Sequence, residues 1–137
     1  RKEGAELITV STDTKFVHLA WQMDEQMLKN VEYKMGSDPA GKLSRTFGVY
    51  DENSGLAQRG AFIINPEGVL VSLEVNHLDI GRNSAELLRK LQANIYKAGH
   101  PEEVCPAKWH PGENTMKPAP EYVGRAGESY VKTYAKG

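Results

Sequence analysis

Residues 60–75 read Gly-Ala-Phe-Ile-Ile-Asn-Pro-Glu-Gly-Val-Leu-Val-Ser-Leu-Glu-Val, and they give the clearest indication of the fold. The run from Gly60 to Asn65 is almost continuously apolar, which is typical of a buried strand. Asn65-Pro66-Glu67-Gly68 predicts a turn, because Pro presets one dihedral and Gly can adopt a positive φ. From Val69 to Val75 alternate residues are apolar, so a second strand should keep one face toward solvent at the edge of a sheet. A β-hairpin is therefore expected.

A helix should follow this hairpin. Asn83-Ser84-Ala85-Glu86 has the spacing of a capping box, and Gly99-His100-Pro101 should end the helix. The apolar stripe of this helix consists of Leu87, Leu88, Leu91, Ile95 and Ala98.

The first part of the chain predicts a strand, a cap and a helix. Ala5–Val10 is apolar and suits a buried strand, and Ser11-Thr12-Asp13 supplies capping oxygens. The helix should run from Asp13 to Gln22 and pack a Phe/Trp face on the sheet. Further short elements are expected: a helix over Asp24–Asn30, a strand over Tyr33–Met35, and helical turns over Ala40–Phe47 that stop at Gly48.

The last part of the chain has a different composition. Residues 101–137 contain five of the seven prolines and no sustained apolar period. We therefore expect an arm or tail with few core contacts.

Composition excludes several classes of protein. With 137 residues, 39% of them hydrophobic, the chain suits one soluble globular domain. Its 17 basic and 18 acidic residues include no dense Lys/Arg run, which argues against binding to nucleic acid. No apolar run reaches the roughly 20 residues of a membrane helix, and the start lacks a secretory signal. A strand almost directly after a first residue that is not Met suggests a fragment.

The single cysteine, Cys105, lies in the loop Glu102-Glu103-Val104-Cys105-Pro106-Ala107-Lys108-Trp109. It can exchange with a sulfur from another chain or segment, or it can be a small buried hydrophobe. An unpaired cysteine fits a reducing compartment, so a cytoplasmic location is expected. The four histidines are scattered without a second soft ligand, which argues against a metal site. His18, beside Phe16 and Trp21, should be structural.

Four ordered blocks together resemble the typical 2-Cys peroxiredoxins, and within them most nearly the peroxidase component of bacterial alkyl hydroperoxide reductase, the AhpC type. They are Ser11–Asp13 with His18–Trp21, Arg59-Gly60 leading into residues 61–68, Gly81-Arg82, and Glu103–Trp109. The likeness runs from about residue 5 to about residue 118. For the tail, Glu121–Gly137, we find no counterpart in the bacterial type.

The resemblance implies an α/β, thioredoxin-like fold with a central mixed sheet flanked by helices and an extended C-terminal arm. Residues 1–100 would form a partial thioredoxin-like domain, and residues 101–137 the arm and tail. Homodimers, and rings of such dimers, are implied as well.

The resemblance also implies thiol peroxidase chemistry on hydrogen peroxide and organic hydroperoxides without a bound cofactor. The family's peroxide-attacking cysteine precedes the Ala5–Val10 strand and is absent here, so this chain alone should be inactive. Cys105 matches the resolving cysteine, whose disulfide a dithiol protein or flavoprotein would reduce. Arg59 matches the arginine that stabilises the thiolate and peroxide, and Arg82 a supporting arginine. Either arginine could instead be an ordinary residue at the end of an element.

Two functions therefore remain open. The first is a subunit of a thiol peroxidase. The second is a non-catalytic thioredoxin-like oligomerisation module, in which the Val69–Val75 strand pairs with its twin in another copy. A Thr-x-x-Cys helix start encoded upstream would favour the first. Trp109 should serve packing in both, either on a neighbouring protomer or within its own loop.

Overall fold

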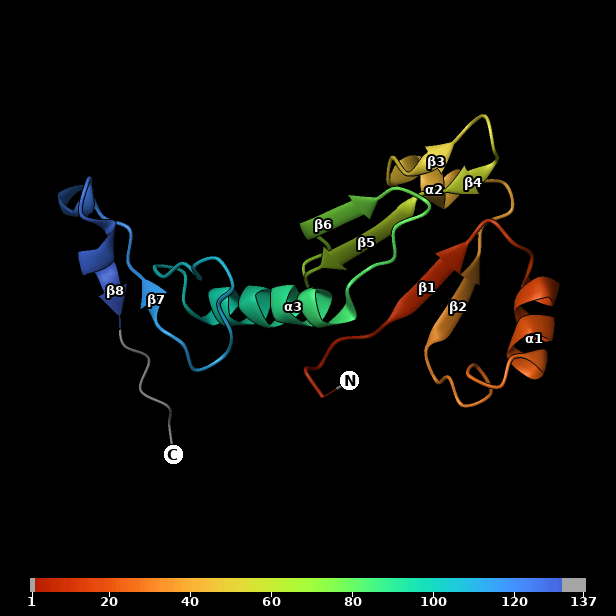
Figure 1. Cartoon of the computed structure of the whole chain (residues 1–137), viewed down its shortest axis with the longest axis horizontal. Helices are drawn as coiled ribbons and strands as arrows, with labels where there is room; N and C mark the ends of the chain where they lie inside the picture. Colours follow the sequence, from red (N-terminus) through yellow and green to blue (C-terminus); the bar gives the residue numbers. More distant parts are fainter. Residues whose placement is uncertain (1, 132–137) are drawn as a thin grey trace. The chain divides into compact units, whose positions relative to one another are not determined.

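The computed structural model describes residues 2–131 (Figure 1), so the expected tail is covered only as far as Val131. The elements in chain order are β1 (Ile8–Ser11), α1 (Lys15–Asp24), β2 (Lys34–Ser37), α2 (Lys42–Thr46), β3 (Tyr50–Asp51), β4 (Leu56–Ala57), β5 (Arg59–Ile64), β6 (Leu70–Asn76), α3 (Ser84–Gly99), β7 (Thr115–Met116), the 3₁₀ helices η1 (Pro120–Tyr122) and η2 (Ala126–Ser129), and β8 (Tyr130–Val131). No helix in this range has the length and apolar character that crossing a membrane requires.

The chain divides into two compact units, and each is described by itself. Unit 1 comprises Arg1–Ala61 and Leu73–Arg82, and unit 2 comprises Phe62–Ser72 and Asn83–Gly137. The elements are α/β in class, as expected. In place of one central mixed sheet, however, the described residues form four two-stranded sheets, because each strand pairs with a single neighbour.

The first sheet and its helix form by local sequence signals. β1 and β2 are parallel, with Ile8 opposite Lys34 and Ser11 opposite Ser37. Parallel neighbours need a crossover connection, and α1 lies in it. Thr14 caps this helix, since its side chain accepts a hydrogen bond from the Val17 amide. The cap is therefore later than Ser11–Asp13, and the helix is shifted two residues toward the C-terminus.

The burial expected for α1 is wrong. Phe16 and Trp21 are 71% and 53% exposed, while His18 is the buried residue of the helix. A sheet of two four-residue strands is too narrow to cover a wide apolar stripe. In α1 the side chain of His18 is therefore buried in place of the two aromatic rings. The predicted helix over residues 24–30 is also wrong, because Asp24 ends α1 and residues 26–30 form turns.

The hairpin prediction is confirmed. β5 and β6 pair with each other, and the amide of Gly68 donates to the carbonyl oxygen of Asn65 at 2.9 Å. The side-chain Oδ1 of Asn65 accepts from the Val69 amide at 2.8 Å, and Gly68 has a φ of +81°. The turn thus uses the residue types that its geometry requires. Leu73 and Val75 on β6 are exposed.

In unit 2, α3 carries the C-terminal arm. The side chain of Asn83 accepts hydrogen bonds from the amides of Ala85 and Glu86, so the predicted cap is confirmed. β7 and β8 are antiparallel, with Thr115 opposite Val131. The expectation of few core contacts in the arm is wrong, because Trp109 and Thr115 are 2% and 0% exposed. The arm folds against its own helix and so buries these residues without a long apolar pattern.

Candidate functional site

Cys105 lies half-buried on the side of α3. Its Sγ is 3.9 Å from the carbonyl oxygen of Ala93, a distance at which the thiol donates a weak hydrogen bond. Burial raises the pKa of the Cys105 thiol above its ordinary value, and the cations of Lys97 and Arg89 counteract part of this rise. In this position the sulfur is a protonated thiol at neutral pH, neither freely exposed nor enclosed.

The chain is fixed directly before Cys105. The amide of Val104 donates to the Met116 carbonyl oxygen at 2.8 Å, and the Met116 amide donates back at 3.0 Å. The carboxylate of Glu103 accepts a hydrogen bond from the Tyr96 hydroxyl at 2.8 Å and another from Thr115 Oγ1. These two hydrogen bonds hold the pKa of Glu103 below its ordinary value, and the bond from Thr115 has the larger effect. Glu103 therefore joins α3, the cysteine loop and β7.

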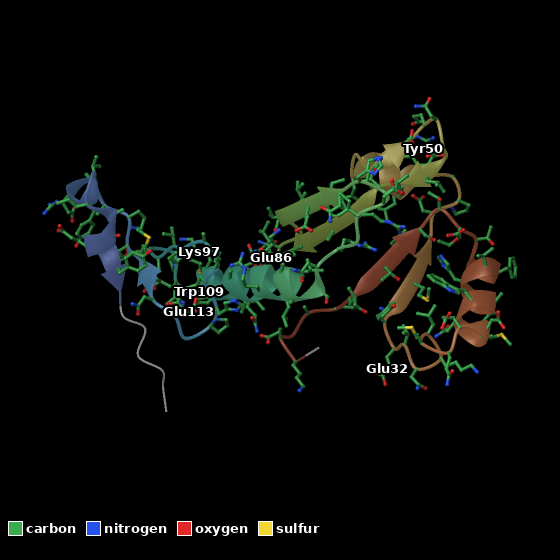
Figure 2. The ribbon with its side chains drawn as sticks, viewed as in Figure 1. Glu32, Tyr50, Glu86, Lys97, Trp109 and Glu113 are labelled. Atoms are coloured by element: carbon green, nitrogen blue, oxygen red, sulfur yellow. The ribbon has the colours of Figure 1, made fainter. Side chains whose placement is uncertain are left out.

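Trp109 fixes the chain after Cys105. Its ring lies 4.9 Å from the ring of Tyr96, and its Nε1 donates to the carbonyl oxygen of Glu113 at 3.1 Å. Figure 2 shows Trp109 and Glu113 close to α3, which carries Glu86 and Lys97. Of the two packing roles expected for Trp109, the structure shows the one within its own chain.

Arg89 connects α3 to this loop. Its Nε and Nη2 donate to the two carboxylate oxygens of Glu86 at 2.7 and 2.9 Å, and its Nη1 donates to the Trp109 carbonyl oxygen at 3.1 Å. The Glu86 hydrogen bond raises the pKa of Arg89, so the guanidinium stays charged. The three-residue spacing of Glu86 and Arg89 on one helix face is typical of such a pair.

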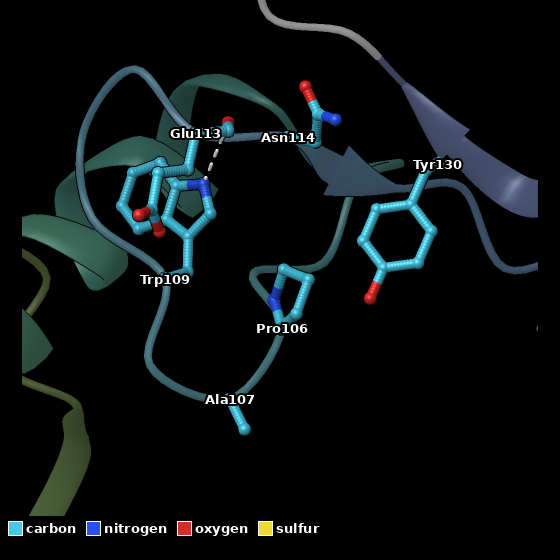
Figure 3. Close-up of a pocket in the computed structure, with 6 residues that line it drawn as sticks. All are labelled: Pro106, Ala107, Trp109, Glu113, Asn114 and Tyr130. Atoms are coloured by element: carbon cyan, nitrogen blue, oxygen red, sulfur yellow. Dashed lines mark hydrogen bonds between the residues drawn. The ribbon is translucent and has the colours of Figure 1, made fainter. Parts of the chain in front are cut away.

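An open hollow of about 450 Å³ lies beside the cysteine loop (Figure 3). It is lined by Pro106, Ala107, Trp109, Glu113, Asn114 and Tyr130.

The two predicted arginines lie in unit 1, where the structure brings them to the same strand. Arg59 begins β5, and its Nε donates to the Leu78 carbonyl oxygen at 3.0 Å. Arg82 donates from Nη1 to the carbonyl oxygen of Gly60 at 2.9 Å. Both side chains are exposed, and no carboxylate pairs with either of them among residues 2–131. Cys105 belongs to unit 2.

The histidines make separate contacts among the residues that the structure describes. Within the described part of the chain, no group of three His, Cys, Asp or Glu side chains could hold a metal ion. His18 is buried, and its Nε2 lies 2.6 Å from Ser11 Oγ, as a structural residue should. His100 stacks on Tyr96 with ring centroids 3.9 Å apart.

Sequence reasoning missed three residues of the cysteine site. Glu103 was seen only as part of the loop motif, and Tyr96 and Thr115 carried no signal of their own. They lie 7 and 12 residues from Glu103 in the sequence, and only the folding of the arm against α3 brings them to its carboxylate.

Comparison with known proteins gives matches along most of the chain. Residues 1–73 match the AhpC/TSA family, and residues 97–129 match the C-terminal domain of 1-Cys peroxiredoxin. The alkyl hydroperoxide reductase C of Salmonella typhimurium is 43% identical over 125 residues, which are 91% of this chain and 67% of that protein. The Enterococcus faecalis AhpC crystal structure superposes with a TM-score of 0.71 at 46% identity, over 74% of this chain and 60% of that chain. The reduced 2-Cys peroxiredoxin of Plasmodium vivax gives a TM-score of 0.81 at 29% identity, over 90% of this chain and 66% of that chain.

These matches decide two earlier expectations. The solved neighbours confirm the thioredoxin-like fold class. Because the matched C-terminal domain of 1-Cys peroxiredoxin extends to residue 129, the likeness to peroxiredoxins continues past residue 118 and includes the first part of the tail. The chain spans about two thirds of the length of the Salmonella relative and 60% of the Enterococcus chain.

Proposed function

Because this chain belongs to the AhpC/TSA family of peroxiredoxins, as its motifs predicted, we propose that it serves in a thiol peroxidase that reduces hydrogen peroxide and organic hydroperoxides. The observation that carries the proposal is the position of Cys105, which is half-buried and held by neighbours on both sides without being enclosed. The relatives are named alkyl hydroperoxide reductase C and 2-Cys peroxiredoxin, which supports a peroxidase and does not favour the non-catalytic module.

The proposed reaction uses two sulfurs, of which these residues supply one. A thiolate from outside these 137 residues attacks the terminal oxygen of the hydroperoxide; the O–O bond breaks, an alcohol or water leaves, and the sulfur becomes a sulfenic acid. Cys105 gives up its proton and then attacks that sulfur as a thiolate. An S–S bond forms, the S–OH bond breaks, and the hydroxyl leaves as water with the proton of Cys105. Alone, the chain should not reduce peroxide.

The arginines would act on the first of these steps. Arg59 has an exposed guanidinium whose Nη groups remain available for a thiolate and a peroxide oxygen. A fixed positive charge there favours the thiolate over the thiol. Arg82, through its bond to Gly60, would support the start of β5 and thereby the position of Arg59.

The partners are part of the same proposal. The disulfide would join the two protomers of a homodimer, and such dimers would form rings. A dithiol protein or a flavoprotein with a reactive cysteine pair would reduce the disulfide by exchange and become oxidised itself. A free cysteine as the receiving thiol suits the reducing cytoplasm.

The test requires both sulfurs in one chain. Residues 1–137 are joined behind the family's N-terminal segment, with its Thr-x-x-Cys helix start, and the protein is treated with hydrogen peroxide. Non-reducing gels should show a dimer that dithiothreitol splits, and Cys105→Ser should abolish it. A reducible dimer that persists in Cys105→Ser contradicts the proposed role. Oligomers without peroxide consumption would support the non-catalytic module.

A further inference from the structure

We propose that Glu103 is a positioning residue that holds Cys105 against α3 and sets how readily the sulfur becomes accessible to a partner sulfur. The inference rests on the proposed function of Cys105 as a receiving thiol. It concerns a residue that makes no hydrogen bond to the Cys105 sulfur. The charge of Glu103 also helps to raise the pKa of that thiol, and the proposed role is a separate one that is exerted through the conformation of the loop.

The first support is the place of Glu103 in the arm. It lies two residues before Cys105, and its carboxylate is the acceptor for donors from two other elements, Tyr96 on α3 and Thr115 on β7. Thr115 is 0% exposed, and Tyr96 is partly buried. Hydrogen bonds to a charged acceptor are stronger than those between neutral groups. The carboxylate thus ties the cysteine loop to both of its neighbours.

The second support is what Cys105 must do to react. In the present position its thiol is half-buried and faces the Ala93 carbonyl oxygen. Disulfide formation requires access to the sulfur and a thiolate, and burial works against both. The segment around Cys105 must therefore leave α3. That movement separates Glu103 from Tyr96, whereas Trp109 and its Arg89 contact lie on the other side of the cysteine.

Two basic side chains near the Glu103 carboxylate also contribute to its lowered pKa. They are His100 at the end of α3 and Lys117 after β7. Because the Glu103 pKa is lowered in the folded arm, the attachment is complete above the ordinary carboxyl pKa and is lost as pH falls through the lowered value. The thiol of Cys105 and the hydroxyl of Tyr96, whose pKa values are both raised, stay protonated throughout this acidic range.

The experiment measures the accessibility of Cys105 in the 137-residue chain with dithiodipyridine, which reacts with thiols down to acidic pH. The thiolate attacks one sulfur of the probe, a mixed disulfide forms, and one thiopyridone leaves and is followed by absorbance. Glu103→Gln keeps the shape of the side chain and removes its charge. After correction for the thiolate fraction, which the loss of the Glu103 charge itself raises, we expect about a tenfold faster reaction in this variant at neutral pH. This is the effect of weakening two charge-assisted hydrogen bonds.

Glu102→Gln is the matched control. Glu102 is the adjacent carboxylate, it is largely exposed, and it lies 3.6 Å from Lys117. Its substitution should leave the rate at which Cys105 reacts with the probe within about twofold of the rate in the original protein. The original protein should also gain accessibility on acidification, after correction for the thiolate fraction, and Glu103→Gln should lack this gain. Equal rates in the two Gln variants, or an acid gain that persists without Glu103, would overturn the proposal.

If circular dichroism shows that Glu103→Gln no longer forms the α3 helix, two further variants test the proposal in its place. Tyr96→Phe and Thr115→Val each remove one donor, and each should raise the rate by a smaller factor. If both folded variants react at the original rate, the inference is wrong. The readout needs no peroxide-attacking cysteine, so it is independent of whether the longer protein turns over peroxide.

Discussion

The guanidinium of Arg89 lies between the carboxylate of Glu86, with which it makes two parallel hydrogen bonds, and the main-chain oxygen of Trp109, 3.1 Å from its Nη1. One side chain thus links the first turns of α3 to the loop that follows Cys105. Glu86 orients the guanidinium, because the paired carboxylate oxygens match its planar fork. The third donor then reaches the main chain of the loop.

This geometry predicts that Arg89→Lys will not preserve the contact. A lysine keeps the charge but cannot donate to Glu86 in parallel and to Trp109 at once. We expect a red shift of Trp109 fluorescence and easier quenching by iodide, measured in a Trp21→Phe background so that only Trp109 reports. Lys90→Arg, next to it on the helix, is the control and should leave the spectrum unchanged. An unchanged spectrum in Arg89→Lys contradicts the link.

Trp109 should dominate the stability of unit 2. It is 2% exposed, so Trp109→Ala is expected to cost about 3–5 kcal/mol of unfolding free energy, as large-to-small changes at buried aromatic sites do. Trp21→Ala is the matched control, because that ring is 53% exposed and its loss should cost about 0.5 kcal/mol or less. Urea unfolding followed by circular dichroism measures both. Similar costs for the two tryptophans would show that the burial is misassigned.

The cap of α3 provides a local test. Asn83 Oδ1 accepts from the amides of Ala85 and Glu86 at 3.0 and 3.2 Å. Asn83→Ala should destabilise the helix by about 1 kcal/mol, whereas Asn83→Asp should retain the cap. Amide hydrogen exchange of the first turn of α3 should rise in the Ala variant alone. Equal exchange in both variants would mean that the side chain does not cap.

The local signals in the sequence predicted the elements that depend on near neighbours. The hairpin turn at Asn65–Gly68 and the Asn83 cap each rest on residues within a few positions of one another, so their chemistry can be read directly. The burial of side chains could not be predicted from near neighbours in the sequence. Phe16 and Trp21 have the spacing of a packed face, yet whether that face is covered depends on how many strands lie beside α1.

The candidate site likewise has a part that the sequence predicts and a part that it does not. Cys105 and the arginines were identified from motifs, and the chain belongs to the family that those motifs indicate. The roles of the three residues stay predictions. The hydrogen bonds that hold the cysteine loop come from Tyr96 and Thr115, which the arm brings to Glu103 by folding back. A segment that folds back in this way has no periodic apolar pattern, so the sequence predicts few core contacts for the arm.

The titration of Cys105 provides the last test. Burial raises its pKa, so its thiolate should form above the ordinary value of about 8.5, as followed by thiolate absorbance. Arg89→Ala removes a nearby cation and should move the midpoint further up. A raised folded pKa stabilises the fold below the unfolded value, and this contribution is lost as pH rises through the folded one. Urea midpoints of the original protein should therefore fall at alkaline pH more than those of Cys105→Ala. A midpoint at or below the ordinary thiol value would contradict the burial of the sulfur beside α3.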